Sequence, residues 1–381
     1  MTARNIKSHR GNRRGIPSFL VCGLGGLLVA CALANSLVIY RDLPLWVMIA
    51  IIPAAIAIFL ALVMATKIVA GEERIIYYHH EIAVAAGTTL FLRLLHQPVL
   101  PYLDITVLGI GLFLACGRIG CLLVGCCHGR PFRWGVRYSE HHANAGFTPH
   151  YVGIPLFPVQ AVESLWALGI VAVGTLMVIR GDAPGSALTL YVIVYGFGRF
   201  CFEFLRGDPE RPYFLGFSEA QWISIILMSA IVYGEATHAL PLTRLHVAIT
   251  VSVVVTMIGV AVHRRLRRTP THLLLRPQHV REIVGALRSA RTTPAETDAA
   301  FHEVSRIHVG TTSLGVQISG SVIPDRGTCI SHYALSCRNR TMTPDFARAV
   351  ANLICVLSHS NCDLQLVQGN RGVFHLLVAE R

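Results

Sequence analysis

Repeated runs of apolar residues, each long enough to cross a lipid bilayer, constrain this chain more than any other feature of its sequence. A hydrocarbon core of roughly 30 Å takes about 20 residues of helix. The chain is 53% hydrophobic and only 14% charged, whereas soluble domains are about 25% charged. Because backbone polar groups must be satisfied within the bilayer, the sequence predicts membrane-spanning helices and excludes an ordinary soluble enzyme.

The apolar runs give about seven to eight expected transmembrane helices. They lie near residues 16–40, 45–70, 82–95, 102–124, 157–179, 187–204, 220–233 and 245–263. Hydrophobicity falls away after Arg268, so the rest should be soluble. The expected fold is an all-α polytopic membrane protein with a basic N-terminal tail at residues 1–15, a transmembrane domain at 16–265 and a small soluble α+β domain at 270–381.

The basic residues behind the net charge of +12 gather at the expected membrane boundaries. They precede the first run and follow the last one, as Arg4, Lys7, Arg10, Arg13, Arg14, Arg264, Arg265, Arg267 and Arg268. Anionic cytoplasmic headgroups attract such segments. We therefore expect both chain ends inside, a lipid bilayer as partner and no nucleic acid. The Leu28–Cys31 stretch looks like a lipoprotein processing site, but its apolar run exceeds the usual signal length, which favours an uncleaved span.

The polar C-terminal part reads as a mixed domain without a chemical motif. Alternating or β-branched residues predict strands at 314–323, 330–337, 364–368 and 373–379, and helical periodicity predicts a helix at 345–358. Its histidines His302, His308, His332 and His375 are expected to be ordinary surface or core residues.

Charged residues lie at the end of the expected sixth span, where a bilayer makes them costly, by about 2.5–3.5 kcal/mol each. Arg199 and Glu203 are four residues apart, hence on one helix face, and Arg206 lies seven from Arg199. Two interpretations remain open: a structural ion pair within a bundle, or an anion-binding face, since guanidinium groups suit phosphate oxygens.

A second unusual segment, Gly117 to Arg130, follows the fourth span. Its glycines at 117, 120, 125 and 129 allow close backbone approach. Arg118 and Arg130 would form a positive pocket beside the headgroups, unless they only snorkel to the interface. Cys116, Cys121, Cys126 and Cys127 lie in or beside this segment, but successive steps of five residues around a helix would not place three of these thiols on one face. We therefore expect no metal site.

Together these segments resemble the prolipoprotein diacylglyceryl transferase family, as a divergent member. The family stretch GRxGN…NGE…GR appears as Gly117–Cys121, Gly125-Cys126 and Gly129-Arg130, and its HPxQLYE element as Phe157–Glu163. YGxxRxxxExxRxPD is closely matched by residues 195–208, and GQxLS by 220–224. The elements follow one another in the family's order, over roughly residues 75–235.

The resemblance implies transfer of a diacylglyceryl group from phosphatidylglycerol to the cysteine of a prolipoprotein signal peptide, at the bacterial inner membrane and without a cofactor. Catalytic roles would fall to Arg118, Arg199 and Glu203. The family's base is a histidine about 25 residues before an aspartate; His79 and His80 both precede Asp104 by about that distance, and we assign His80. Substrate-binding positions are expected at the remaining matches: Cys121, Gly129, Arg130, Gln160, Glu163, Tyr195 and Arg206.

Departures from the family pattern leave other functions open. Cys121 and Cys126 stand for its asparagine and glutamate, and Phe157 and Val162 for the histidine and tyrosine of HPxQLYE. The lost polar groups would fit a paralogue that binds lipid without turnover or uses another substrate. A membrane thiol oxidoreductase using the cysteines is a third hypothesis. The outward-facing site of the family also conflicts with a cytoplasmic N-terminus and eight spans, which would put the loop at 125–151 inside.

Overall fold

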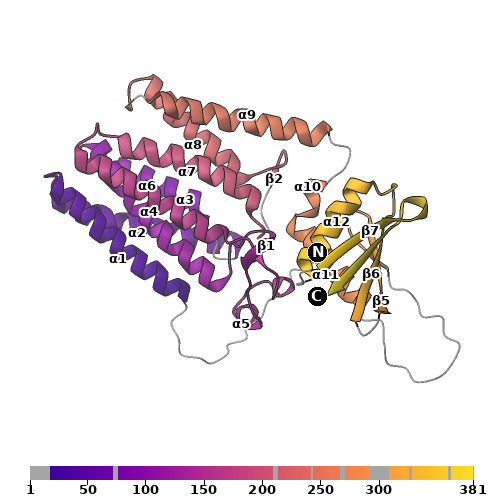
Figure 1. The fold of residues 1–381 in the computed structure, drawn as a ribbon. Coiled ribbons are helices and arrows are strands. Elements are labelled where there is room, and N and C mark those ends of the chain that lie inside the picture. Colours follow the sequence, from indigo (N-terminus) through magenta and orange to yellow (C-terminus); the bar gives the residue numbers. More distant parts are fainter. Residues whose placement is uncertain are drawn as a thin grey trace.

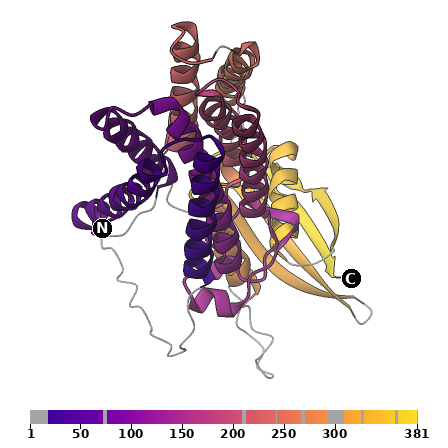
Figure 2. The same cartoon turned by 90° about the vertical axis from the view of Figure 1, so that its left-hand side faces the viewer.

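A computed structural model describes residues 18–71, 76–208, 213–241, 243–266, 271–291, 309–325, 328–358 and 362–380. The expected basic tail at residues 1–15 lies outside these ranges. The N-terminal two thirds of the chain form a helix bundle, and the C-terminal strands lie together beside it (Figures 1 and 2).

The bundle consists of long helices joined by short connections. The helices are α1 (Ser18–Tyr40), α2 (Leu45–Ala70), α3 (Tyr77–Leu94), α4 (Val99–Val124), α6 (Val159–Arg180), α7 (Ser186–Phe202), α8 (Glu219–Ala236) and α9 (Arg244–Leu266). The longer connection after α4 holds β1 (Pro131–Val136), α5 (Glu140–Asn144) and the 3-10 turn Pro149–Tyr151. A 3-10 turn at Glu203–Leu205 and the short strands β2 (Tyr213–Phe214) and β3 (Phe217–Ser218) join α7 to α8.

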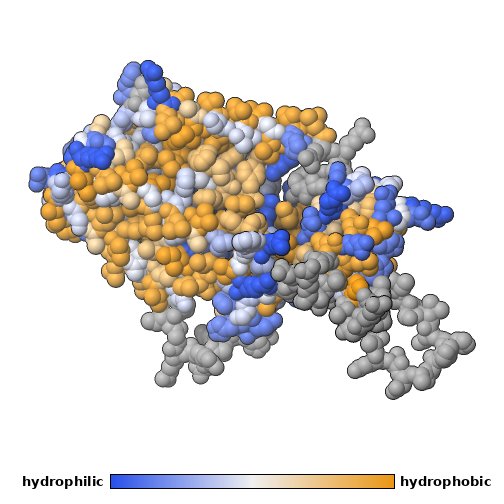
Figure 3. All heavy atoms as spheres, in the orientation of Figure 1, coloured by the Kyte–Doolittle hydropathy of each residue, from blue (hydrophilic) through white to orange (hydrophobic). Residues whose placement is uncertain are grey.

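Six helices in the described ranges are long and apolar enough to cross a membrane, namely α1, α2, α4, α6, α7 with its following turn, and α9. Large apolar side chains on them point outward; Val69, for example, is 87% exposed. Figure 3 shows apolar residues over the bundle and hydrophilic ones toward its ends. These features confirm the expected polytopic membrane protein. The third and seventh expected spans, α3 and α8, are also helical with 18 residues each, but they are less apolar and are not among the six.

The end of α4 and the start of α1 lie at the same end of the bundle, because Gly120 packs against Phe19 and Cys22. At the opposite end, the Asp104 carboxylate accepts hydrogen bonds from the backbone N–H groups of Gly185 (2.6 Å) and Leu188 (2.7 Å). Asp104 thus satisfies donors at the start of α7 that have no partner within the helix.

The C-terminal region confirms the expected strands and helix. It contains α10 (Thr271–Leu274), α11 (Pro277–Arg291), β4 (Val309–Thr311), β5 (Val316–Asp325), β6 (Thr328–Cys337), α12 (Pro344–Leu357), β7 (Cys362–Gln368), the 3-10 turn Asn370–Gly372 and β8 (Phe374–Glu380). The strands form one antiparallel sheet in the order β4-β5-β6-β8-β7. The sequence analysis did not identify α11 or β4.

One hydrophobic core joins this region to the connection between α4 and α6. Tyr138, Phe147, Tyr151, Ile154 and Leu156 from that connection belong to the same buried cluster as residues of α11, α12 and the sheet. Because burial of apolar surface stabilises by about 25 cal/mol per Å², the two parts are held together by more than the chain between them.

Candidate functional site

Glu163 of α6 lies at the centre of a buried charge cluster at the end of α4 and α7. Its side chain is fully buried. Arg118 of α4 donates to Glu163 Oε1 from Nη2 (3.1 Å), and its Nε lies 3.0 Å from Oε2. The hydroxyl of Tyr195 donates to Oε1 at 2.9 Å. Side chains from α4, α6 and α7 therefore converge on one carboxylate.

Arg199 and Arg206 complete the cluster from the end of α7. Arg199 Nε lies 3.9 Å from Glu163 Oε1, and its Nη1 donates to Glu203 Oε2 at 2.7 Å. Arg206 Nη1 lies 3.6 Å from Glu163 Oε2. The Arg199–Glu203 pair follows the expected four-residue spacing, whereas α7 ends before Arg206, whose ψ of 141° is extended. Arg206 thus reaches Glu163 by a turn of the chain and not along a helix face.

Carboxylates balance the arginines of this cluster. Asp208 accepts from Arg206 Nε (2.8 Å) and Nη2 (3.2 Å), so Arg118, Arg199 and Arg206 face Glu163, Glu203 and Asp208. Burial alone would lower the pKa of Arg206, but Asp208, Cys127 and Glu163 raise that pKa well above its ordinary value. Arg206 therefore stays charged.

Two guanidinium nitrogens of the cluster keep donor capacity. Arg118 Nε and Arg206 Nη1 are buried and make no hydrogen bond of good geometry with the described residues. Buried N–H donors of charged groups bind anions strongly, because water does not compete for them. Both nitrogens form ion pairs with Glu163 Oε2, at 3.0 and 3.6 Å, so an anionic oxygen that reaches them would compete with that carboxylate for their hydrogens.

A short backbone pairing fixes the turn that carries Arg206. Gly129 and Arg206 form an antiparallel bridge, Arg130 N donates to Leu205 O (2.9 Å), and Arg130 Nε donates to Arg206 O (3.1 Å). A Cβ on Gly129 would collide with the carbonyl of Phe157. Burial lowers the pKa of Arg130. Gly129 thus serves close backbone packing, and Arg130 holds the neighbouring backbone.

The thiols of Cys121, Cys126 and Cys127 lie within 4.8 Å of one another. The expectation that they lie on different faces is wrong, because α4 ends at Val124. Gly125 follows with a left-handed φ of 87°, and Cys127 with a φ of 55°, so the chain folds back over the end of the helix. Hydrogen bonds from the Cys121 and Cys126 thiols, with Arg206 and Arg118 nearby, lower the pKa of Cys127 well below its ordinary value despite its burial.

Gln160 fixes this turn from α6. Its Nε2 donates to the carbonyl of Cys126 at 2.8 Å, and the side chain is fully buried. Further along the same helix, Ser164 donates to Ala115 O (2.8 Å). Of the two polar residues expected on this helix, Gln160 therefore binds the end of α4 and Glu163 binds the arginines, whereas Ser164 was not among the expected residues.

His80, the assigned base, lies elsewhere on α3. It is buried; its Nδ1 lies 2.9 Å from the carbonyl of Ile76, and its ring contacts Phe59 of α2 at 4.6 Å between centroids. No contact between described residues joins His80 to Glu163 or the arginines. His79 instead pairs with Glu219 (2.7 Å). Asp104, which both histidines precede by about 25 residues, lies at the opposite end of the bundle.

Aromatic hydroxyls at the start of α3 lie closer to the cluster. Tyr78 hydrogen-bonds Ser224 at 2.7 Å, and its ring packs 6.0 Å from that of Tyr195. Tyr77 hydrogen-bonds Tyr191 at 2.6 Å. Tyr77, Tyr78 and the role of Asp208 were not predicted from the sequence. Their only sequence signal was polarity near the matched motifs, which does not indicate direction around a helix.

Comparison with known proteins finds a matching family. The sequence model of the family described as prolipoprotein diacylglyceryl transferase matches residues 21–236. That range contains every residue of the cluster. No solved structure matches the chain.

Curated relatives carry the name phosphatidylglycerol–prolipoprotein diacylglyceryl transferase. The one from Clostridium tetani is 34% identical over 152 residues, 39% of this chain and 58% of the relative. A relative from Clostridium perfringens, whose name ends in the number 2, is 34% identical over 138 residues, which are 34% of this chain and 49% of the relative. A relative from Dehalococcoides mccartyi is 30% identical over 151 residues, which are 40% of this chain and 56% of the relative. The chain spans about half the length of these relatives. Since the family model covers more than half of its 381 residues, the chain belongs to the prolipoprotein diacylglyceryl transferase family.

Proposed function

We propose that this protein transfers the diacylglyceryl group of phosphatidylglycerol to the cysteine thiol of a prolipoprotein signal peptide. The substrates are those that the names of the relatives give. One observation of the structure supports the proposal above others: Arg118, Arg199 and Arg206 surround Glu163 in a buried cluster, and Arg118 Nε and Arg206 Nη1 make no hydrogen bond of good geometry with the described residues.

The chemistry requires a place for developing negative charge. The thiol sulfur attacks a glyceryl carbon, a C–S bond forms, and the C–O bond to the phosphate breaks. Glycerol phosphate then leaves with the electron pair. Arg118 Nε and Arg206 Nη1 would donate to the phosphate oxygens as this charge develops. Glu163 and Glu203 would act as positioning residues that hold the guanidinium planes.

The thiol proton needs an acceptor, and we retain His80 for this role. If Nδ1 donates to Ile76 O, the buried Nε2 is left with a lone pair and no partner in the described residues. A neutral imidazole with such a free nitrogen is a suitable base. His80→Gln should then abolish turnover without abolishing phospholipid binding, whereas His79→Gln should retain turnover.

We further propose a bacterial inner-membrane location, with the division into the tail at 1–15, the transmembrane domain at 16–265 and the C-terminal domain at 270–381. A multi-pass membrane protein agrees with the spans of the described helices. The cluster, the connection after α4 and the C-terminal region lie toward one end of the bundle. The side of the membrane on which this end lies decides which substrates reach it. Labelling Cys126→Ser and Cys201→Ser variants with a membrane-impermeant thiol reagent would locate that side.

The test is complementation of a cell depleted of its own diacylglyceryl transferase. The wild-type chain should restore lipoprotein modification, and Arg199→Ala should not. Arg180→Ala is the matched control, since Arg180 is exposed at the opposite end of α6 and its loss should leave rescue intact. Equal membrane levels must be verified for all three. Absence of rescue by a well-inserted wild-type chain would contradict the proposal, as would rescue by Arg199→Ala.

A second function is favoured by Cys121 and Cys126, which stand where the family pattern has an amide and a carboxylate. A relative that binds phospholipid without turnover would keep the arginines and dispense with those groups. Purified protein would then bind phosphatidylglycerol, lose binding in Arg118→Ala, and form no thioether with a signal-peptide cysteine.

A further inference from the structure

The turn at the end of α4 holds a group of thiols to which the proposed transfer assigns no chemical step. Cys121 is buried in the last turn of α4, Cys127 is half-buried, and Cys126 is exposed. Their sulfur atoms lie within 4.8 Å of one another. The backbone holds it, since Gly125 reverses the chain and Gln160 binds the Cys126 carbonyl.

We infer that Cys121, Cys126 and Cys127 form a binding site for a thiophilic cation of the Zn²⁺ class. Zinc–thiolate bonds of about 2.3 Å place the sulfurs of a tetrahedral site about 3.8 Å apart. Thiols already within 4.8 Å need to approach by only about 1 Å. Rotation of the exposed Cys126 side chain can supply part of this movement.

The surrounding charge favours such a complex. Zn²⁺ with thiolate ligands from these residues carries a net negative charge, because each thiol releases its proton on binding. Arg118 and Arg206 interact electrostatically with Cys127 and would offset that charge. An uncharged pocket would not do so, and the cost of burying the complex would be larger.

The site would leave one coordination position open. Structural zinc sites have four protein ligands, whereas sites with three protein ligands bind water or a further small ligand. The exposure of Cys126 gives an ion a route to the thiols. This inference does not depend on diacylglyceryl transfer, because it rests only on the thiols and their neighbours.

The experiment uses untagged full-length protein, purified in detergent under reducing conditions and titrated with Co²⁺ and then Zn²⁺. We expect about one Co²⁺ per chain, an intense thiolate-to-cobalt charge-transfer absorption, and its loss when Zn²⁺ displaces the cobalt. Cys121→Ser, Cys126→Ser and Cys127→Ser should each lose this absorption. Cys201→Ser, which removes an exposed thiol of α7, should retain it.

A second measurement avoids dependence on variant folding. In the wild-type protein, Zn²⁺ should protect Cys121, Cys126 and Cys127 from alkylation, measured by peptide mass spectrometry, while Cys201 reacts at an unchanged rate. Absorption that survives in the triple serine variant would overturn the site. So would equal alkylation with and without Zn²⁺, or a disulfide among these residues that persists under reduction and blocks the metal.

Discussion

Glu163 shows how one residue can organise a site that sequence describes only as scattered polar positions. It is fully buried and lies near Arg118, Arg199 and Arg206. Without a carboxylate among them, three guanidinium groups would repel one another in a medium that screens poorly. The negative charge of Glu163 therefore allows the three arginines to lie close together, whether or not Glu163 contacts a substrate.

Glu163→Gln tests this dependence on stability. The amide keeps the shape but removes the charge, which takes away the carboxylate partner of Arg118 and leaves Arg199 and Arg206 with Glu203 and Asp208; removing one partner of a buried pair costs about 3–5 kcal/mol. Thermal unfolding in detergent should show a clearly lower midpoint. Glu219→Gln is the control, because Glu219 pairs with His79 at side-chain exposures of 38% and 40%, where ion pairs contribute about 0–1 kcal/mol. Equal midpoints for the two variants would refute the central role of Glu163.

At this scale the sequence predicted the members of the site better than their partners. The Arg199–Glu203 pair follows from helix spacing, and the structure shows it at 2.7 Å. The grouping of Cys121 and Cys127 does not follow, because it depends on where α4 stops. A glycine such as Gly125 can adopt a left-handed φ, but its presence in the sequence does not show that the chain adopts this conformation there.

The elements around the site act through their ends. The turns after α4 and α7 meet at the bridge between Gly129 and Arg206, and this bridge fixes two segments 77 residues apart in the numbering of the chain. Because Arg130 also binds the Leu205 and Arg206 carbonyls, a shift of either turn would move Arg206 relative to Glu163.

Gly129→Ala should therefore disturb the site through the backbone. The added methyl group would meet the Phe157 and Leu205 carbonyls, which cannot move as a side-chain tip can, and overpacking of this kind costs about 1–3 kcal/mol. We expect a lower unfolding midpoint together with weaker phospholipid binding. In Gly169→Ala the methyl group has open space within α6, and both quantities should stay near wild type. Unchanged phospholipid binding in Gly129→Ala would show that the bridge does not position Arg206.

The helices and strands with strong hydropathy or alternation could be predicted from the sequence. Those whose formation depends on packing against other parts of the chain could not. The long spans and the strands β5 to β8 appear as expected. Helix α11 was missed, although Val280, Ile283, Val284 and Leu287 follow helical spacing and are buried. The sequence shows its apolar face but not the surfaces that cover it, which come from β4, β5 and the connection after α4.

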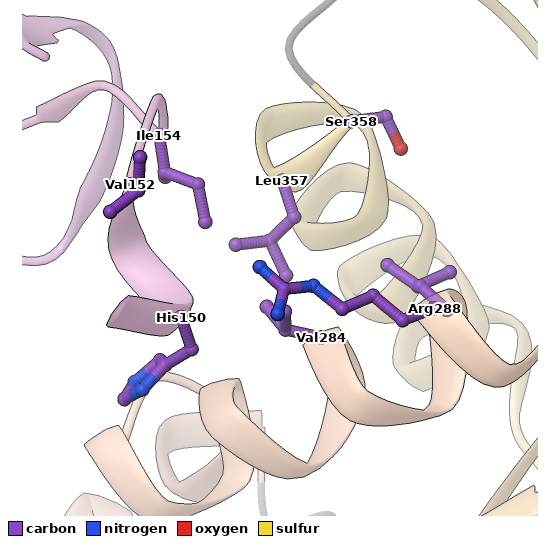
Figure 4. A pocket seen from close by; sticks show the side chains of 8 residues that line it. His150, Val152, Ile154, Val284, Arg288, Leu357 and Ser358 are labelled. Atoms are coloured by element: carbon purple, nitrogen blue, oxygen red, sulfur yellow. The ribbon is translucent and has the colours of Figure 1, made fainter. Parts of the chain in front are cut away.

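The whole molecule is a bundle whose C-terminal region rests on the connection next to the site. Tyr138 and Tyr151 share a buried core with Val284 and Leu357. Figure 4 shows His150 and Ile154 of the connection beside Val284 and Arg288 of α11 and Leu357 of α12, around a cavity between the two parts. Since the same connection contains Gly129, which pairs with Arg206, movement of the C-terminal region would reach the backbone that holds Arg206.

His150 makes this contact sensitive to pH. Burial, followed by Arg281, His128 and Arg288, lowers the pKa of His150 from 6.5 to about 4. In a separated state the imidazole would regain its ordinary pKa, so between about pH 6.5 and 4 the separated state binds a proton that the docked state does not. Docking should therefore be unaffected above pH 6.5 and weaken as the pH falls toward 4.

Hydrogen exchange can test this prediction. Protection factors, which correct for the intrinsic pH dependence of exchange, should fall in α11 and in residues 138–156 between about pH 7 and pH 5 in the wild-type chain. His150→Gln cannot take up the proton and should lose most of this decline. His141→Gln, which changes an exposed histidine of α5, should behave like wild type. A decline of equal size in His150→Gln would assign the pH dependence to other groups, and the link between His150 and the position of the C-terminal region would then be wrong.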